Sequence, residues 1–429
     1  MDTSVSLASN FKVRYGAFQN PLPEDNSISD FAKFVKAEER PGKQLEFPIK
    51  VSHEHGVTHD KTDSAFALEA AVDSVMKTAI VDGTNIMMVA NIAYPIMARA
   101  KAGVSRGGGS GGAFWKPIDY KVESLMVAAE LYRELAIMYG PGPDSTALCN
   151  IGVTAAAAIT GANLAAGQVV RLTTASWAPG IWPQMIGGFV DIYESDGSTL
   201  RESEVEVTAV GKTNCRLTLQ KDGSTASVGS GDILLVKLAH GNSCIGVQPI
   251  LENTGSMFNI DASVYPMWQA ESFAVGGALT RAKIGQFASR LFPTGLKGGG
   301  KMFGGSAMFA DLVEETSQLQ QYTSNTDSVK RQGADNLEYL TSIGKINVAL
   351  HRYMKQGIAM FFARDVLKRV GSTDLTFSLD GTNEWFYREM DNNAGCQIRI
   401  FTNQAPIVEI PWFCGILTGI ASNADIASA

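Results

Sequence analysis

The 429-residue sequence is poor in cysteine, in histidine and in uninterrupted apolar runs. Its five cysteines include no Cys-x-x-Cys pair, which argues against a zinc knuckle or a disulfide framework, and we expect them to be buried reduced thiols. Basic residues do not exceed acidic ones. The 36 Lys and Arg against 43 Asp and Glu give a net charge of −7, which does not support a general nucleic-acid-binding protein.

Membrane and export signals are missing as well. No run of about 18 apolar residues occurs, so no membrane-spanning helix is expected. The first residues, "MDTSVSLASNFKVRYG", have no basic start followed by an apolar stretch, which argues against a secretory signal. We therefore expect a soluble protein made in a reducing compartment, long enough for two or three domains.

Enzyme motifs are also missing: there is no Gly-x-Ser-x-Gly elbow and no recognisable Cys–His setting. The stretch "PTGLKGGGKM" comes close to a phosphate-binding loop, with Gly295, Gly300 and Lys301 at the required spacing. Met302 occupies the position of the magnesium-binding hydroxyl, and a thioether does not ligate a hard cation. The preceding residues also have helical rather than strand spacing, so we prefer a mobile glycine loop to a nucleotide site.

Histidine is concentrated in one place, "HEHGVTHD", which contains His53, His55 and His59. Imidazoles two residues apart on a strand share a face, so two metal ligands are geometrically feasible. The metallo-hydrolase pattern His-x-His-x-Asp-His is not met, because Val57 and Thr58 stand at its fifth and sixth positions. We prefer a solvent-facing hairpin tip and keep a metal-dependent hydrolase using these three histidines as the alternative.

The first third of the chain predicts an arm, a hairpin and a long helix. Residues 1–42 are polar and contain the charge run "KAEERPGK", as expected of an extended arm. In residues 43–75, "EFPIKVSH" and "SAFALEAAV" are interpreted as strands joined by the polar turn "HGVTHDKTD". A helix is predicted over about 119–140, with Asp119 as N-cap and Gly140 as stop. Its two apolar stripes, which predict burial on two sides, are Val122, Leu125, Met126, Ala129, Ala136 and Leu131, Leu135, Met138.

The rest of the chain predicts a β-rich insertion followed by mixed structure. Short alternating runs from Gly167 to His240, with turns at Asp196-Gly197 and Asp222-Gly223, favour a small antiparallel β domain. We then expect a linker over 249–269. Helices are predicted over 271–292 and 306–323, mixed strand and helix over 339–370, and a pair of strands over 396–413.

This order of parts resembles the major capsid protein of tailed bacteriophages, the Hong Kong 97-type fold. "AFALEAAVDSVMKTAIVDGTNIMMVANIAYPIMARAKAG", with a helix closing on "ELYRELAIMYG", is similar to the family's passage from projecting loop to spine helix. "NSCIGVQPILENTGSMFNIDASVYPMWQAE" is similar to a second family passage, with Val264 where Arg, Ser or Thr is frequent. The linker lengthened by Gly107–Gly112 and the long "LKGGGK" loop depart from the pattern. A shell-forming nanocompartment protein of the same fold remains a further alternative.

The resemblance implies an α+β fold with an N-terminal arm, an extended hairpin loop, a long spine helix and a β-rich insertion. It implies a division into 1–42 (arm), 43–75 (hairpin), 76–165 (peripheral domain with the spine helix), 166–245 (insertion), 246–395 (axial-type domain) and 396–429 (strands returning to the peripheral domain). The hairpin would lie across a neighbouring subunit and the arm would clasp another. The contact candidates are Glu39, Arg40, His53, His55, His59 and Lys61.

The function implied is structural, without catalytic residues or cofactors. Copies would form the hexamers and pentamers of an icosahedral shell that encloses double-stranded DNA without reading its sequence. The mild negative charge is compatible with a wall that does not hold DNA tightly. A separate scaffolding protein is expected because about 42 residues precede the hairpin, together with a portal and decoration proteins. The protein would be made in the host bacterial cytoplasm and reside in the virion, away from membranes.

Overall fold

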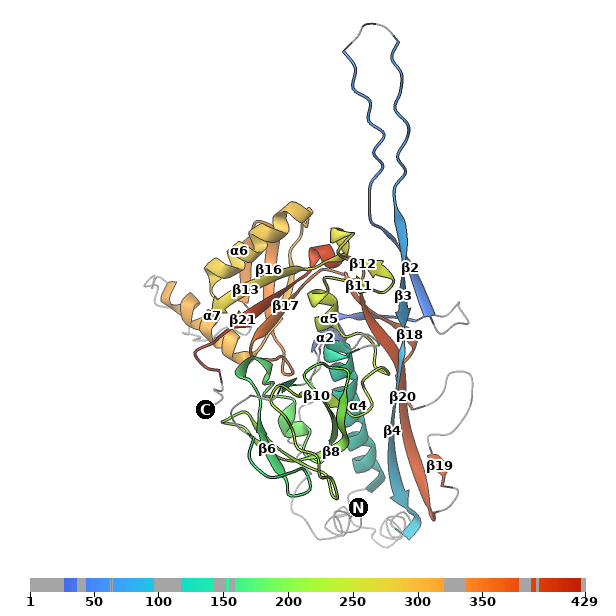
Figure 1. Ribbon diagram of the computed structural model, residues 1–429, viewed down its shortest axis with the longest axis vertical. Coiled ribbons are helices and arrows are strands. Elements are labelled where there is room, and N and C mark those ends of the chain that lie inside the picture. Colours follow the sequence, from blue (N-terminus) through green and yellow to red (C-terminus); the bar gives the residue numbers. More distant parts are fainter. Residues whose placement is uncertain are drawn as a thin grey trace, which may run out of the picture.

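The computed structural model describes residues 27–36, 44–61, 63, 65–95, 117–141, 152–153, 159–319, 337–377, 387–390 and 393–425. Three larger sheets and their helices form most of a body, and a long narrow hairpin projects from one end of it (Figure 1). Within these ranges, no helix has both the length and the apolar character needed to cross a membrane.

The axial sheet is built from the second half of the chain, in the order β13-β21-β17-β14-β16-β15. Its strands are β13 (Glu271–Gly277), β14 (Gly300–Gly304), β15 (Leu337–Thr341), β16 (Gly344–Leu350), β17 (Ile358–Ala363) and β21 (Gly415–Ile420). Every residue of β17, "IAMFFA", is buried, as expected of a strand covered on both faces. Helices α6 (Arg281–Leu291) and α7 (Ser306–Leu319) pack on this sheet. The helix predicted over 306–323 is confirmed for residues 306–319, and residues 320–323 lie outside the described residues.

Two predictions for this region are wrong. The helix expected over 271–292 begins only at Arg281, after the Thr280 cap, because residues 271–277 alternate in burial and form β13. The mixed segment 339–370 contains no helix: it forms the end of β15, then β16, β17 and the start of β18 (Leu367–Thr376). Here β-branched and aromatic residues, together with pairing to strands distant in sequence, override local helix propensity.

A second sheet, the peripheral sheet, has the order β1-β18-β20-β19, with β4 on the other side of β20. Its strands are β1 (Lys33–Lys36), β4 (Thr84–Ala93), β18 (Leu367–Thr376), β19 (Tyr387–Glu389) and β20 (Gly395–Val408). The strand pair expected over 396–413 is the single strand β20. The last strand, β21, joins the axial sheet, so the expected return of the C-terminal strands to the peripheral region applies to β20 alone.

The predicted long helix is confirmed as α4 (Pro117–Tyr139). It begins two residues before Asp119, which therefore lies in the first turn instead of capping it, and Gly140 follows its last residue. Leu125 and Ala129 pack on the peripheral sheet, while Leu131, Leu135 and Met138 enter the main core. Met126 is exposed. The two stripes thus bury α4 on two sides, between the peripheral sheet and the rest of the body.

The β-rich insertion is confirmed as a third sheet, ordered β5-β10-β7-β8-β9-β6. Its strands are β5 (Gly152–Val153), β6 (Gln168–Arg171), β7 (Phe189–Tyr193), β8 (Leu200–Gly211), β9 (Arg216–Gln220) and β10 (Ile233–Val236). Asp196 fixes the turn between β7 and β8 by accepting hydrogen bonds from the backbone and hydroxyl groups of Ser198 and Thr199.

The segment expected as a linker over 249–269 is packed structure. It contains most of α5 (Val247–Glu252) and the small strands β11 (Ser256–Met257) and β12 (Ile260–Asp261). Ile250, Leu251 and Trp268 are buried, so apolar residues without clear periodicity here belong to the core. The remaining short elements are α2 (Ser27–Phe31) and 3₁₀ turns at Thr174–Ser176, Trp182–Gln184, Pro266–Trp268, Phe292–Thr294 and Pro411–Phe413.

Candidate intersubunit surfaces

The projecting hairpin is longer than the sequence predicts. Strand β2 (Gln44–Lys50) pairs antiparallel with β3 (Met76–Asp82), not with the expected return strand at 64–72. Beyond these strands, residues 51–61 and 65–75 continue outward as two extended legs (Figure 1). The legs are held by backbone hydrogen bonds from Val51 to Val75 and from His55 to Val72, both 3.0 Å. The structure therefore presents two extended backbones to solvent far from the body.

The returning leg carries an apolar face that the described part of its own chain leaves exposed. Phe66 is 51% exposed, Leu68 79% and Val72 53%, and all three lie at even spacing in extended backbone. Alternate residues of an extended segment point to the same side. Burying a Phe or Leu side chain is worth about 1.5–3 kcal/mol. An apolar face of this kind on a projecting loop indicates burial against another molecule.

The base of the hairpin is fixed to the body. Val51 and Ala79 pack with Ile260, Ala262 and Trp268 in a small buried cluster. The backbone amide of Ile80 donates to the carbonyl of Phe258 at 3.1 Å, and Lys77 lies over the ring of Tyr265 at 5.8 Å. The legs are thus carried outward from a firmly packed root.

The histidines lie on the legs and do not converge on a common point. His53, His55 and His59 are all exposed, as is Lys61 near the tip. In the described ranges, no group of three His, Cys, Asp or Glu side chains is placed to hold a metal ion. This part of the chain therefore gives no geometric support to the hydrolase alternative. Glu39, Arg40 and Gly107–Gly112 lie outside the described residues.

The glycine stretch does not form a mobile loop throughout. Gly300–Gly304, including Lys301 and Met302, is strand β14 in the axial sheet. A Cβ on Gly300 would lie 2.2 Å from the carbonyl oxygen of Phe362, so only glycine fits there. The Lys301 ammonium lies over the ring of Phe303 at 4.7 Å, and burial lowers its pKa. The stretch is built for close strand packing, and Lys301 is directed at aromatic rings.

The described end of the arm, residues 27–36, packs on its own subunit. Ile28, Ser29 and Ala32 are completely buried, and β1 pairs in parallel with β18. This contradicts, for these residues, the expectation of an extended arm. The short helix α2 was missed because five residues are too few to show helical periodicity.

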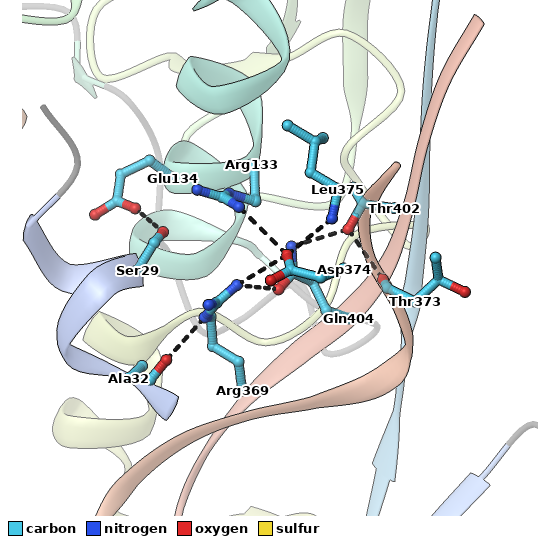
Figure 2. Close-up of polar contacts among 10 residues, drawn as sticks. All are labelled: Ser29, Ala32, Arg133, Glu134, Arg369, Thr373, Asp374, Leu375, Thr402 and Gln404. Carbon is cyan, nitrogen blue, oxygen red and sulfur yellow. Dashed lines mark hydrogen bonds and ion pairs between the residues drawn. The ribbon is translucent and has the colours of Figure 1, made fainter. Parts of the chain in front are cut away.

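Two buried arginines and one carboxylate anchor this segment to the peripheral sheet (Figure 2). Arg369 donates from Nε to the carbonyl of Ala32 at 2.9 Å and from Nη1 to Gln404 at 2.9 Å. Asp374 accepts from Arg369 at 3.1 Å and from Arg133 at 3.3 Å. Burial opposes ionisation of Asp374, but the Leu375 amide and both guanidinium groups outweigh it and keep its pKa below the ordinary value.

Arg369→Met should destabilise the fold by about 2 kcal/mol, because it removes the donor to the Ala32 carbonyl and leaves Gln404 without this partner. Urea unfolding measures the change, and amide hydrogen exchange of residues 27–36 should accelerate. Lys368→Met is the matched control: the Lys368–Glu409 pair is about one-third exposed, so its loss should cost less than about 1 kcal/mol. Equal effects of the two variants would contradict this assignment.

A second buried polar connection joins the segment to the spine helix and the axial sheet. Glu134 on α4 is completely buried, and it accepts from the Ser29 hydroxyl and from His351 Nε2, the latter at 2.9 Å. The backbone amide of Tyr353 donates to His351 Nδ1, which places the imidazole proton on Nε2. Burial opposes ionisation of Glu134, but the His351 and Ser29 hydrogen bonds and the Arg133 charge outweigh it, so its pKa is lowered.

A groove of about 870 Å³ lies beside the hairpin root, between the β3–β4 junction, α4 and β10. Leu238 at its mouth is 66% exposed and has a left-handed backbone (φ 60°), which is unfavourable for leucine. The buried carboxylate of Asp191 holds it there by accepting from its amide at 2.7 Å. Cys244 also lines the groove, and burial raises its pKa to about 11, so the thiol is unreactive near neutral pH.

Comparison with solved structures identifies the architecture. A chain of the cyanophage A-1(L) capsid aligns over 95% of this chain and 96% of its own length, with a TM-score of 0.52 and 10% sequence identity. The protein has the fold of a tailed-phage capsid protein. The projecting hairpin, spine helix and β-rich insertion are thus parts of a capsid fold of the Hong Kong 97 type.

Other solved structures are similar at lower scores. The Mycobacterium phage Adephagia structure matches 99% of both chains at a TM-score of 0.44 and 8% identity. An encapsulin complex from Synechococcus elongatus matches 96% of this chain and 93% of its own, at a TM-score of 0.41 and 6% identity. Because both scores lie below 0.5, the capsid fold is assigned from the cyanophage chain. No protein-family model matches the sequence, and no curated protein does.

Proposed function

We propose that this chain is the major capsid protein of a tailed bacteriophage. Copies of it would assemble through hexamers and pentamers into an icosahedral shell that encloses double-stranded DNA. The observation that carries the proposal is the capsid fold over nearly the whole chain, combined with the uncovered apolar leg of the hairpin. A fold by itself does not determine function, whereas a surface built to be buried indicates association.

The hairpin is the main contact between subunits in this proposal. Its leg would lie on a neighbouring subunit and bury Phe66, Leu68 and Val72 there. On the receiving subunit, β4 offers a suitable edge: in the described part of the chain it pairs with β20 alone, through one edge. An extended segment added to such an edge gains backbone hydrogen bonds as well as apolar burial. We retain His53, His55, His59 and Lys61 as contact residues on the hairpin, and Glu39 and Arg40 on the arm.

The division of the chain into an arm, hairpin, peripheral domain, insertion and axial domain is part of the proposal, with the hairpin extended to Asp82. A separate scaffolding protein, a portal and decoration proteins are its further partners. The role is structural and not enzymatic. The mature location is the virion, after synthesis in the host bacterial cytoplasm.

Electron microscopy of the purified full chain, produced with and without the scaffolding protein from its own source, tests the proposal. We expect closed icosahedral particles in at least one condition. A uniform small oligomer in both conditions, with stoichiometric zinc by metal analysis, would overturn it in favour of the hydrolase alternative. Closed shells filled with a protein cargo and lacking DNA in the source organism would contradict the phage assignment.

A further inference from the structure

One segment of the chain has a net charge opposite in sign to that of the whole protein. Between Glu271 and Asp311 there is no Asp or Glu, although the protein as a whole carries a net charge of −7. The same stretch contains five cations, and one of them, Lys301, is directed at aromatic rings in the axial sheet. The other four define the basic surface: Arg281, Lys283, Arg290 and Lys297.

Helix α6 places these cations on the outside of the axial sheet. Ile284, Phe287, Ala288 and Leu291 are buried, which fixes the inner face of the helix. Arg281 and Arg290 are exposed on the solvent side and Lys283 is half-buried, whereas the exposed Lys297 follows in the turn before β14. Figure 1 shows α6 at the edge of the body, beside the axial sheet.

Few carboxylates oppose these cations. In the described ranges, Glu271 pairs with Arg290 at 3.3 Å, and Glu315 accepts from the backbone amide of Arg281 at 2.7 Å. No carboxylate there lies within 4 Å of the charged groups of Arg281, Lys283 or Lys297. By contrast, Arg201, Lys221 and Lys237 of the insertion are each ion-paired. The basic surface therefore retains unneutralised positive charge.

Part of the surface is also held in place before any partner binds. Arg290 lies over the ring of Phe273 at 4.9 Å and is still 55% exposed, so its guanidinium is oriented but accessible. Lys283 donates to the carbonyl of Ala278 at 2.9 Å. Restricting these side chains in advance reduces the entropy lost on binding a polyanion.

We propose that the basic surface contacts the phosphodiester backbone of the enclosed double-stranded DNA, and that this face of α6 lines the interior of the shell. This inference rests on the proposed function. Arg and Lys on an open surface bind phosphates through charge without reading sequence. Because each subunit of this net-acidic protein offers only a few phosphate contacts, its binding to DNA is weak and sensitive to salt. The DNA is then held in position without being fixed tightly.

The test compares DNA binding by the unassembled full chain and by a triple variant, Arg281→Gln with Lys283→Gln and Lys297→Gln. Fluorescence anisotropy with a labelled duplex is recorded between 50 and 200 mM salt. Three phosphate contacts give a slope of about −2.7 in log affinity against log salt, which corresponds to about a 40-fold loss over this range. We expect the wild type to show at least this slope, and the triple variant, which keeps Arg290, to bind weakly with a slope no steeper than about −0.9.

Lys212→Gln with Arg216→Gln is the matched control, because both residues are exposed cations on the insertion. This control should keep the wild-type slope. Equal slopes for the wild type and the triple variant would overturn the proposal. So would equal competition by polyglutamate at the same charge concentration, which would indicate an acidic protein partner.

Intact DNA-filled particles provide the second readout. A bulky amine reagent that does not enter the shell should leave Lys283 and Lys297 unmodified, and labelling of both would place the surface outside and overturn the inference. Particle formation is scored separately by electron microscopy. If the wild-type chain forms shells but fails the DNA-binding or labelling test, the role of the basic surface is refuted and the proposed function stands. If the wild-type chain forms no shells with or without its scaffolding protein, the proposed function itself fails.

Discussion

Glu134→Gln should lower the free energy of unfolding by about 3 kcal/mol at pH 7. The carboxylate is completely buried and accepts from Ser29 and His351, and the imidazole proton is kept on Nε2 because Nδ1 accepts from Tyr353. A Gln amide keeps the shape of the side chain but loses the charge and one acceptor. The change therefore weakens the connection between α2, the spine helix and the residues that follow β16.

The effect of Glu134→Gln should depend on pH in a defined direction. The folded-state pKa of Glu134 lies below its ordinary value, so ionised Glu134 contributes its full stability above the ordinary carboxyl pKa. That contribution disappears as the pH falls through the lowered pKa, where the protonated carboxyl resembles the Gln amide. The difference in unfolding free energy between the two proteins should accordingly shrink in acid.

Urea unfolding of the wild type and the variant at several pH values measures this difference. Glu123→Gln is the matched control, because Glu123 is an exposed residue of the same helix, and it should change stability by less than about 0.5 kcal/mol. A Glu134→Gln protein as stable as the wild type at pH 7, or a difference that grows in acid, would contradict the role assigned to this contact.

Phe66→Ser combined with Leu68→Ser should abolish closed shells while leaving the subunit folded. Both side chains are exposed on the returning leg, Phe66 by 51% and Leu68 by 79%, so the fold loses little packing. The proposed contact with the neighbouring subunit loses two apolar anchors, each worth about 1.5–3 kcal/mol. Because every subunit would make this contact in the proposed shell, the loss would be repeated throughout it.

Electron microscopy and sedimentation follow assembly, and thermal unfolding of the unassembled chain confirms that the fold is retained. Ala67→Ser with Glu69→Gln changes the alternate positions of the same leg, which point to the opposite side, and this variant should still assemble. Normal shells from the Phe66 and Leu68 variant would show that the leg is not the contact. Loss of shells in the control as well would show that the leg tolerates no change, and would leave the apolar face unsupported.

Local sequence pattern was a good guide to the elements whose signal is local. Two apolar stripes and a glycine stop predict the helix around 119–140, and alternating runs separated by Asp-Gly turns predict the insertion. Both are confirmed. The hairpin was predicted in the right place, but its paired strand begins at Met76 because the legs extend beyond their ladder.

The errors have a common cause, which is partners distant in sequence. Residues 271–277 resemble the start of a helix and become β13 by pairing with β21, more than 140 positions later. The glycines before Met302 resemble a loop, yet β14 begins at Gly300 because it pairs with β16 on one side and β17 on the other. The apparent linker is core because its side chains meet α4 and the hairpin root, which no window of sequence contains.

The sequence by itself determined the spine helix, the β-rich insertion, the projecting hairpin and the lack of an enzyme motif, since each depends on periodicity or composition over a short stretch. Only the tertiary structure decided that Phe66 and Leu68 lie uncovered, that Ser29, Glu134 and His351 meet, and that α6 turns its cations outward. Whether a side chain is exposed or in contact depends on which surfaces the folded chain brings together. Those surfaces come from segments as far apart as residues 29 and 351, whose pairing is set by the packing of the whole core.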